Sequence, residues 1–168
     1  MIKEKLDLIL EYATNEISKQ QFESKFPEVK DMKYLEQEFN SAYLNKDASA
    51  IDIIKMITHK YYDDDFLYKM YKKLIVECWH HQHENIALSF QFKYKNPDCI
   101  DTVVEAMYLH CEHWDEEDDR DPFVRKCAYI LGDLRTEYAI QKLKELSLSS
   151  DPIIKEYSTY QLQRIGEI

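Results

Sequence analysis

The chain has 168 residues, of which 45% are hydrophobic and 32% are charged, and its formal net charge is −10. This balance is typical of a folded chain with a core of its own, and it excludes a disordered one. The negative charge repels phosphate backbones, so direct binding of nucleic acid is not expected. No apolar run approaches the roughly 20 residues that a membrane-spanning helix needs, so no membrane association is expected.

Apolar residues recur at helical spacing along the whole chain. In chain order, the stripes that predict helices are Leu6–Ile17, Phe22–Phe26, Met32–Tyr43, Ile51–Tyr61, Leu67–Cys78 and Ile86–Tyr94. Ser18 and Gln21 have the spacing of a capping box before the second stripe, and the segment from Val103 is also predicted to be helical. Only two glycines occur, which disfavours β-hairpins and phosphate-binding loops because both need positive φ. We therefore expect an all-α protein of about nine or ten helices.

Prolines beside an acid or an amide mark the expected helix starts in the second half of the chain. They occur in Asn96-Pro97-Asp98, Asp121-Pro122 and Asp151-Pro152. An Asp at the N-cap accepts backbone N–H bonds, and a proline in the first turn loses no hydrogen bond there. Asp121 and Asp151 are 30 residues apart, which is the length of a helical hairpin. A recurring period of this size predicts a solenoid.

The two segments that begin at these aspartates can be aligned. One reads DPFVRKCAYILGDLRTEYAIQKLKEL and the other DPIIKEYSTYQLQRIG, with matches at Val124/Ile154, Arg125/Lys155 and Ala128/Ser158. They resemble the HEAT-like repeats of phycobilisome lyases, whose pattern is close to D-P-x-V-R-x-x-A followed by Leu and by L/I-G. The first segment is one residue short before Leu131-Gly132. The resemblance implies a right-handed stack of antiparallel helical hairpins, in which the small residue lets two helices approach and the Arg or Lys braces the Asp of a neighbouring repeat.

We expect a single all-α domain over residues 1–168. Residues 1–62 have helical periodicity without the repeat pattern, so they are expected to form less regular helices. Residues 63–168 are expected to form the HEAT-like repeats, which are clearest over residues 83–168, where a degenerate unit runs from His83 into NPDCIDTVVEAM.

The four cysteines, Cys78, Cys99, Cys111 and Cys127, lie far apart and inside apolar helical patterns. We expect all four to be small buried hydrophobic residues in a reducing cytosol. The first residues, MIKEKLDLILEYATNE, include spaced acids and no cleavage signature. They do not predict a signal peptide, and a cytoplasmic location is expected.

Histidines at residues 80, 81 and 83, followed by Glu84, and at residues 110 and 113 beside Cys111 are candidates for a metal site. Zinc needs three or four converging ligands, and no C-x₂-C or H-E-x-x-H pattern is present, so we expect a polar loop and a helix end instead of a metal. The sequence also lacks a Gly-rich loop, G-x-S-x-G and a Cys–His pair at a known spacing. Neither catalysis nor a cofactor is expected.

Acidic residues cluster at two places. The stretch EHWDEEDDRD, residues 112–121, has seven acids against Arg120 and a net charge of −6 (−7 + 1). Two interpretations stay open, a flexible solvated loop or a match for a basic surface, and Trp114 favours the second because aromatic anchors amid charged rims are typical of interfaces. The residues predicted to contact a partner are Glu112, Trp114, Asp115, Glu116, Glu117, Asp118 and Asp119, together with Tyr61, Tyr62, Asp63, Asp64 and Asp65.

Small, acidic, helical-repeat chains without a catalytic site resemble the immunity proteins encoded beside bacterial toxins. The chain is similar to HEAT-like immunity proteins of contact-dependent growth inhibition systems in W-H-H-x-H-E (Trp79–Glu84), in NPDCIDTVVEAM and in D-P-F-V-R-K-C-A. This resemblance implies a protein that binds a cognate toxin domain, often a basic nuclease, and blocks its active site or RNA-binding face. One alternative is a HEAT-repeat scaffold or accessory subunit. A HEAT-like DNA glycosylase is the other, but it needs a basic groove, and only Lys69, Lys72 and Lys73 cluster here.

Overall fold

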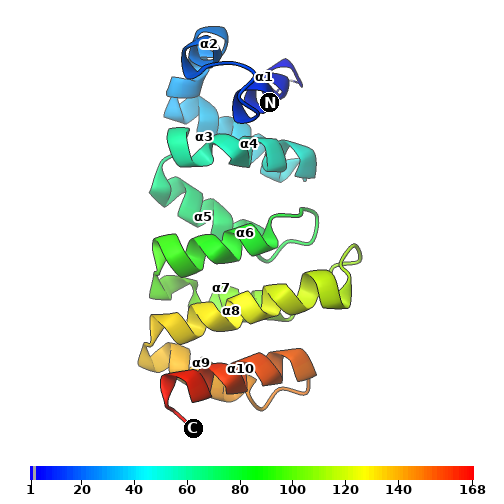
Figure 1. The fold of residues 1–168 in the computed structure, drawn as a ribbon, viewed down its shortest axis with the longest axis vertical. Helices are drawn as coiled ribbons and strands as arrows, with labels where there is room; N and C mark the ends of the chain where they lie inside the picture. Colours follow the sequence, from blue (N-terminus) through cyan, green and yellow to red (C-terminus); the bar gives the residue numbers. More distant parts are fainter. Residues whose placement is uncertain (2) are drawn as a thin grey trace. The chain divides into compact units, whose positions relative to one another are not determined.

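The computed structural model describes residue 1 and residues 3–168, except for the side chains of Glu116 and Glu117. All regular structure in this part of the chain is helical (Figure 1). The α-helices are α1 (Lys3–Ala13), α2 (Lys19–Lys25), α3 (Met32–Leu44), α4 (Ala48–Tyr61), α5 (Asp64–Leu74), α6 (His83–Leu88), α7 (Ile100–Met107), α8 (Asp121–Leu134), α9 (Glu137–Leu146) and α10 (Pro152–Ile165). Short 3₁₀ turns span Pro27–Lys30 and Pro97–Cys99, and π-helical turns span Ser89–Tyr94 and Glu116–Arg120. The prediction of an all-α protein is confirmed.

The described chain divides into two compact units. The first unit contains Met1–Leu74 and Trp79–His81, and the second contains Ile75–Cys78 and Gln82–Ile168. Among the described residues, no helix has both the length and the apolar character needed to cross a membrane.

In the first unit, α1 and α3 both pack against α4. The core is built from the predicted apolar stripes and includes Ile9, Phe22, Leu35, Phe39 and Ile54, all of them buried. At the start of α2, the Ser18 hydroxyl accepts a hydrogen bond from the Gln21 N–H, and the Gln21 side chain accepts one from the Ser18 N–H. The predicted capping box is therefore confirmed.

In the second unit, α8 contacts α6, α7, α9 and α10. The helices α6, α8 and α10 form one layer, and α7 and α9 lie behind it (Figure 1). The aligned small residues Ala128 and Ser158 are both fully buried. The central position of α8 explains why seven of its residues are buried: Phe123, Val124, Cys127, Ala128, Ile130, Leu131 and Gly132.

All three proline motifs lie at helix starts, as predicted, and the N-cap role is confirmed for two of them. The Asp151 carboxylate accepts hydrogen bonds from the N–H groups of Ile153 and Ile154, and the Asn96 side chain accepts one from Asp98. Asp121 does not act as an N-cap, because the π-helical turn before it runs directly into α8 and places Asp121 inside the helix. Its carboxylate accepts a hydrogen bond from the Tyr157 hydroxyl instead, at 2.7 Å.

The expectation for the cysteines needs correction. Cys78 and Cys111 form a disulfide within the second unit, with their Cα atoms 5.1 Å apart. Cys99 and Cys127 are buried thiols, as expected, and burial raises the pKa of Cys127. The pairing could not be inferred from a sequence separation of 33 residues, because it depends on the tertiary contact that brings the two side chains together.

Candidate functional site

Residues 112–121, here called the acidic segment, are fixed at both ends. Cys111, directly before the segment, is bonded to Cys78. Near its end, the Arg120 side chain is only 2% exposed. Its Nε donates to the Leu109 carbonyl at 3.2 Å, and its Nη2 forms an ion pair with the Asp151 carboxylate. In the sequence Arg120 is one cation among acids, and in the structure its ion pair ties the acidic segment to the start of α10.

Trp114 provides a third attachment in the middle of the acidic segment. Its ring is half-buried and lies edge-on to His83, with ring centroids 4.6 Å apart, and 5.4 Å from Phe123. His83 is itself held by the Glu77 carbonyl, 2.8 Å from its Nε2. Trp114 therefore anchors the acidic segment to its own unit, and only the remaining exposed part of its ring is available for the predicted contact with a partner.

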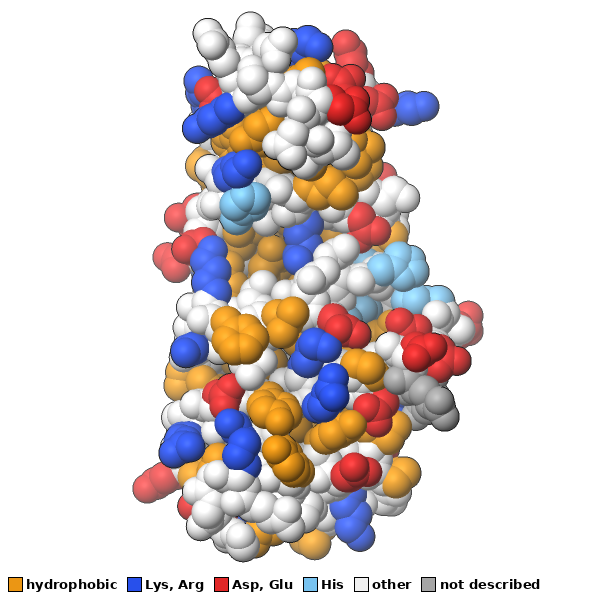
Figure 2. Space-filling view, viewed as in Figure 1, with side chains coloured by type: hydrophobic (Ala, Val, Ile, Leu, Met, Phe, Trp, Pro, Cys, Tyr) orange, Lys and Arg blue, Asp and Glu red, His pale blue; other side chains and the backbone are white. Residues whose placement is uncertain are grey.

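Four carboxylates of the acidic segment face solvent, and two of these also shape the turn. Glu112, Asp115, Asp118 and Asp119 are all exposed. The Asp119 carboxylate accepts a hydrogen bond from the Asp115 N–H at 2.9 Å, and the Asp115 carboxylate accepts one from the Asp118 N–H at 3.1 Å. The predicted contact side chains of Glu116 and Glu117 lie outside the described residues. Acidic side chains gather at this edge of the second unit in Figure 2.

The second predicted cluster belongs to the first unit. Asp63, Asp64 and Asp65 are exposed, and the Asp63 carboxylate accepts a hydrogen bond from the Phe66 N–H at the start of α5. Tyr61 is half-buried and donates its hydroxyl proton to Glu23. Tyr62 is only 8% exposed and donates to the Leu35 carbonyl, so it is a core residue and its assignment as a contact residue needs correction.

Residues 75–82 form a loop between α5 and α6, where the sequence predicts one, but His80 in this loop and His83 at the start of α6 do not face solvent. His80 and His83 are buried, and each has its Nε2 within hydrogen-bond distance of a backbone carbonyl, that of Leu74 and that of Glu77 respectively. Their role in the fold is to satisfy carbonyl groups near the ends of helices. Within the described residues, no three His, Cys, Asp or Glu side chains are placed to hold a metal ion together.

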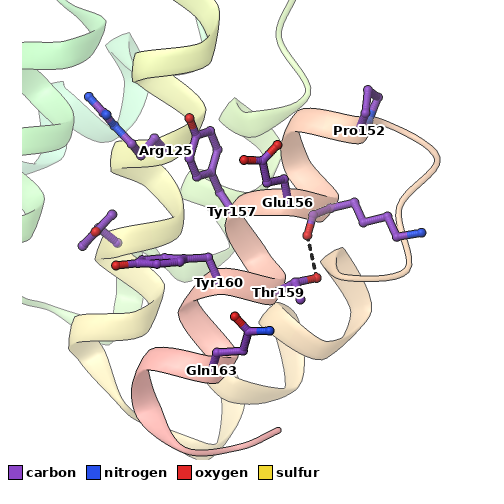
Figure 3. A pocket seen from close by; sticks show the side chains of 9 residues that line it. Arg125, Pro152, Glu156, Tyr157, Thr159, Tyr160 and Gln163 are labelled. Carbon is purple, nitrogen blue, oxygen red and sulfur yellow. Dashed lines mark hydrogen bonds between the residues drawn. The ribbon is translucent and has the colours of Figure 1, made fainter.

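A groove of about 700 Å³ lies on the surface of the second unit between α8 and α10 (Figure 3). Five lining residues come from one face of α10, at spacings of three and four, and two come from α8. The α10 face consists of Pro152, Glu156, Thr159, Tyr160 and Gln163, α8 contributes Arg125 and Tyr129, and Lys155 and Tyr157 complete the lining. Figure 3 shows the Tyr157 and Tyr160 side chains extending from α10 toward α8.

The tyrosines of the groove are fixed by their neighbours. The Tyr157 hydroxyl donates to Asp121, and burial together with this bond raises the pKa of Tyr157 to about 12. With this raised pKa, the phenol of Tyr157 stays protonated over the physiological range. The centroids of the Tyr129 and Tyr160 rings are 6.1 Å apart, and the guanidinium carbon of Arg164 lies 4.9 Å from the Tyr129 centroid.

The cations of the groove differ from what the repeat resemblance implies. Neither Arg125 nor Lys155 forms an ion pair with another described residue, and both are exposed. The neighbouring aspartate, Asp151, pairs with Arg120 instead, one residue before the aligned segment begins.

Sequence reasoning missed the groove because its lining mixes polar and aromatic residues, so a search for apolar stripes passes over it. The available signal was the spacing of Pro152, Glu156, Tyr160 and Gln163 along one helix face.

Comparisons with known proteins add no assignment: no family model, curated protein or solved structure matches the chain.

Proposed function

We propose that the chain is an immunity protein that binds and neutralises a cognate bacterial toxin domain, with the acidic segment as its main contact. One observation carries the proposal. The acidic segment concentrates like charges, which repel one another, yet Trp114, Arg120 and Asp121 attach it to the rest of the second unit at three points. Attachment keeps the carboxylates together where a free loop would let them separate. This favours a match to a basic surface over a solvated linker.

The chemistry of the acidic segment fits a nuclease as the toxin. A nuclease binds phosphates through Lys and Arg side chains, and exposed carboxylates such as those of Glu112 and Asp118 can occupy the same positions. Opposite charges on the two proteins also steer their encounter, so association is fast and slows as salt is added. The proposal places the complex in the cytoplasm, with no cofactor and no direct contact to nucleic acid.

We further propose that the helices form HEAT-like repeats stacked as antiparallel hairpins. The alternation of α6, α8 and α10 with α7 and α9 between two layers supports this arrangement for the second unit (Figure 1). A HEAT-repeat scaffold or accessory subunit is the second candidate function. The groove between α8 and α10 favours it, because a scaffold would use a contact surface separate from the acidic segment.

The test begins with the reading frame immediately upstream. Its C-terminal domain should arrest growth when expressed alone, and co-expression of this chain should restore growth. Replacing Asp115, Glu116, Glu117, Asp118 and Asp119 with Asn or Ser should weaken binding and flatten its salt dependence. The matched control removes the same number of negative charges at exposed positions elsewhere, from Glu4, Asp7, Glu16, Glu105 and Glu137.

Two results would count against the proposal. An upstream product that does not arrest growth, or whose arrest this chain does not relieve, removes the immunity function. Equal losses of affinity in the two neutralised variants would show that total charge matters and that the acidic segment is not the contact.

A further inference from the structure

The groove between α8 and α10 has the opposite charge to the acidic segment. Arg125 and Lys155 are exposed and form no ion pair with another described residue, and Glu156 is the one acid in the lining. The lining therefore carries a net charge of +1 (+2 − 1) in a chain of net charge −10. On the face drawn in Figure 2, hydrophobic, basic and acidic side chains are interspersed over α8 and α10.

Between these cations the groove presents aromatic rings that are already in place. Tyr157 is fixed by its hydrogen bond to Asp121, and the Tyr129 ring contacts both the Tyr160 ring and the Arg164 guanidinium. Tyr160 is 47% exposed, so much of its ring is open to contact with another molecule. Tyrosines contribute large contact areas at interfaces, and rings that are fixed beforehand lose little entropy on binding.

We propose that this groove binds a segment of a partner protein that carries apolar side chains flanked by carboxylates. The apolar side chains pack on Tyr157 and Tyr160, and the carboxylates pair with Arg125 and Lys155. A guanidinium can hold a carboxylate through two parallel hydrogen bonds, which makes Arg125 the stronger of the two contacts. The groove volume of about 700 Å³ is enough for a few side chains of such a segment.

The charge of the groove selects against a basic segment, because like charges brought together at an interface are destabilising. This inference goes beyond the proposed function, in which the acidic segment binds a basic surface. It also does not depend on that function, since a scaffold with another partner would present the same groove.

The test is a titration of the isotope-labelled full chain, followed by the chemical shifts of its backbone amides. The probe is the peptide acetyl-Asp-Leu-Phe-Asp-amide, and the control is acetyl-Lys-Leu-Phe-Lys-amide. We expect saturable shifts with the acidic peptide, confined to residues 125–129 and 152–163, and binding at least tenfold weaker with the basic one. Equal binding of the two peptides, no saturable shift, or shifts centred elsewhere would overturn the inference.

Variants separate the groove from the charge of the whole chain. Arg125→Glu combined with Lys155→Glu should weaken binding of the acidic peptide at least tenfold and improve binding of the basic one. Lys3→Glu combined with Lys33→Glu changes the total charge by the same amount on exposed residues of the first unit and should leave both affinities within twofold. Equal losses in the two variants would overturn the inference. The inference would also be overturned if sedimentation showed that the wild type is a dimer and that the groove variant is a monomer. The groove would then be occupied by a second copy of the chain.

Discussion

The Arg120 guanidinium pairs with the Asp151 carboxylate across 31 residues of sequence, and the pair joins the end of the acidic segment to the first turn of α10. The Arg120 and Asp151 side chains are 2% and 16% exposed. Asp151 also accepts the N–H groups of Ile153 and Ile154, and Arg120 also donates to Leu109. One ion pair thus supports a helix start and a surface segment together.

Replacing Arg120 with Ala should lower the free energy of unfolding by about 3 kcal/mol, because it leaves a partly buried carboxylate without its cation. Urea titration followed by circular dichroism measures the change. Lys144→Ala is the matched control, since the Lys144–Glu167 pair is mostly exposed, and it should cost no more than about 1 kcal/mol. Similar small losses in the two variants would mean that Arg120 is not a structural residue.

Stability should depend on the ionisation of Asp151 at acid pH. Burial raises the pKa of Asp151, but the Ile154 N–H and the Arg120 guanidinium together lower it more, so the net pKa lies below its ordinary 3.8. A lowered carboxyl pKa adds stability that is complete above the ordinary value and is lost as pH falls through the lowered one. The stability difference between the wild type and Asp151→Asn should therefore be constant above about pH 5 and shrink below about pH 4. If the stability difference between the two proteins persists undiminished at pH 2, the charge of the Asp151 carboxylate is not its source.

The Cys78–Cys111 disulfide should stabilise the second unit by about 4 kcal/mol, the loop-closure estimate for 33 residues. Unfolding with and without reductant measures this value. The Cys78→Ser and Cys111→Ser double variant should match the reduced protein and should not respond to reductant. Thiol titration of the unfolded wild type should find two reactive groups, and four would show that the chain keeps this pair reduced. To obtain the count for the producing cell, cells are lysed in denaturant with an alkylating reagent and the attached alkyl groups are counted by mass spectrometry.

Gly132→Ala should destabilise the second unit by about 1–3 kcal/mol, although Gly to Ala in a helix interior usually stabilises by about 1 kcal/mol. A Cβ at this position would clash with the Gln161 carboxamide of α10 and would lie 2.8 Å from Nη2 of Arg164. The control is the same substitution in a Gln161→Ala background, where room for the methyl group should restore the usual sign. Thermal unfolding of the wild type, the two single variants and the double variant gives the coupling free energy between residues 132 and 161.

The sequence was sufficient for the helices and for several of their ends. Apolar periodicity located the stripes that became α3 and α4, and the residues at the start of α10 have the capping geometry that their order predicts. These features depend on neighbours a few residues apart, so they can be read locally. The position of Asp121 could not be read in this way, because the turn before it is π-helical and continues into α8.

The candidate site was less accessible to sequence reasoning. Charge density located the acidic segment, but not its attachments, since Cys111, Trp114 and Arg120 each contact residues far away in the sequence. Trp114 was predicted as a contact residue because composition cannot distinguish an exposed anchor from a ring packed on Phe123. The groove depends on α8 and α10 lying side by side, and the alignment of Arg125 with Lys155 gave no sign that both side chains would be left unpaired on one surface.

The hydrogen bond from Tyr157 to Asp121 has a thermodynamic consequence for the two surfaces. Asp121 ends the acidic segment and Tyr157 lines the groove, so one 2.7 Å contact belongs to both. A ligand at either surface that strengthens or breaks this bond changes affinity at the other, and by linkage the effect is the same in both directions. Tyr157→Phe would remove this route of coupling while keeping the ring, so the mutual effect of two partners on their affinities should become smaller.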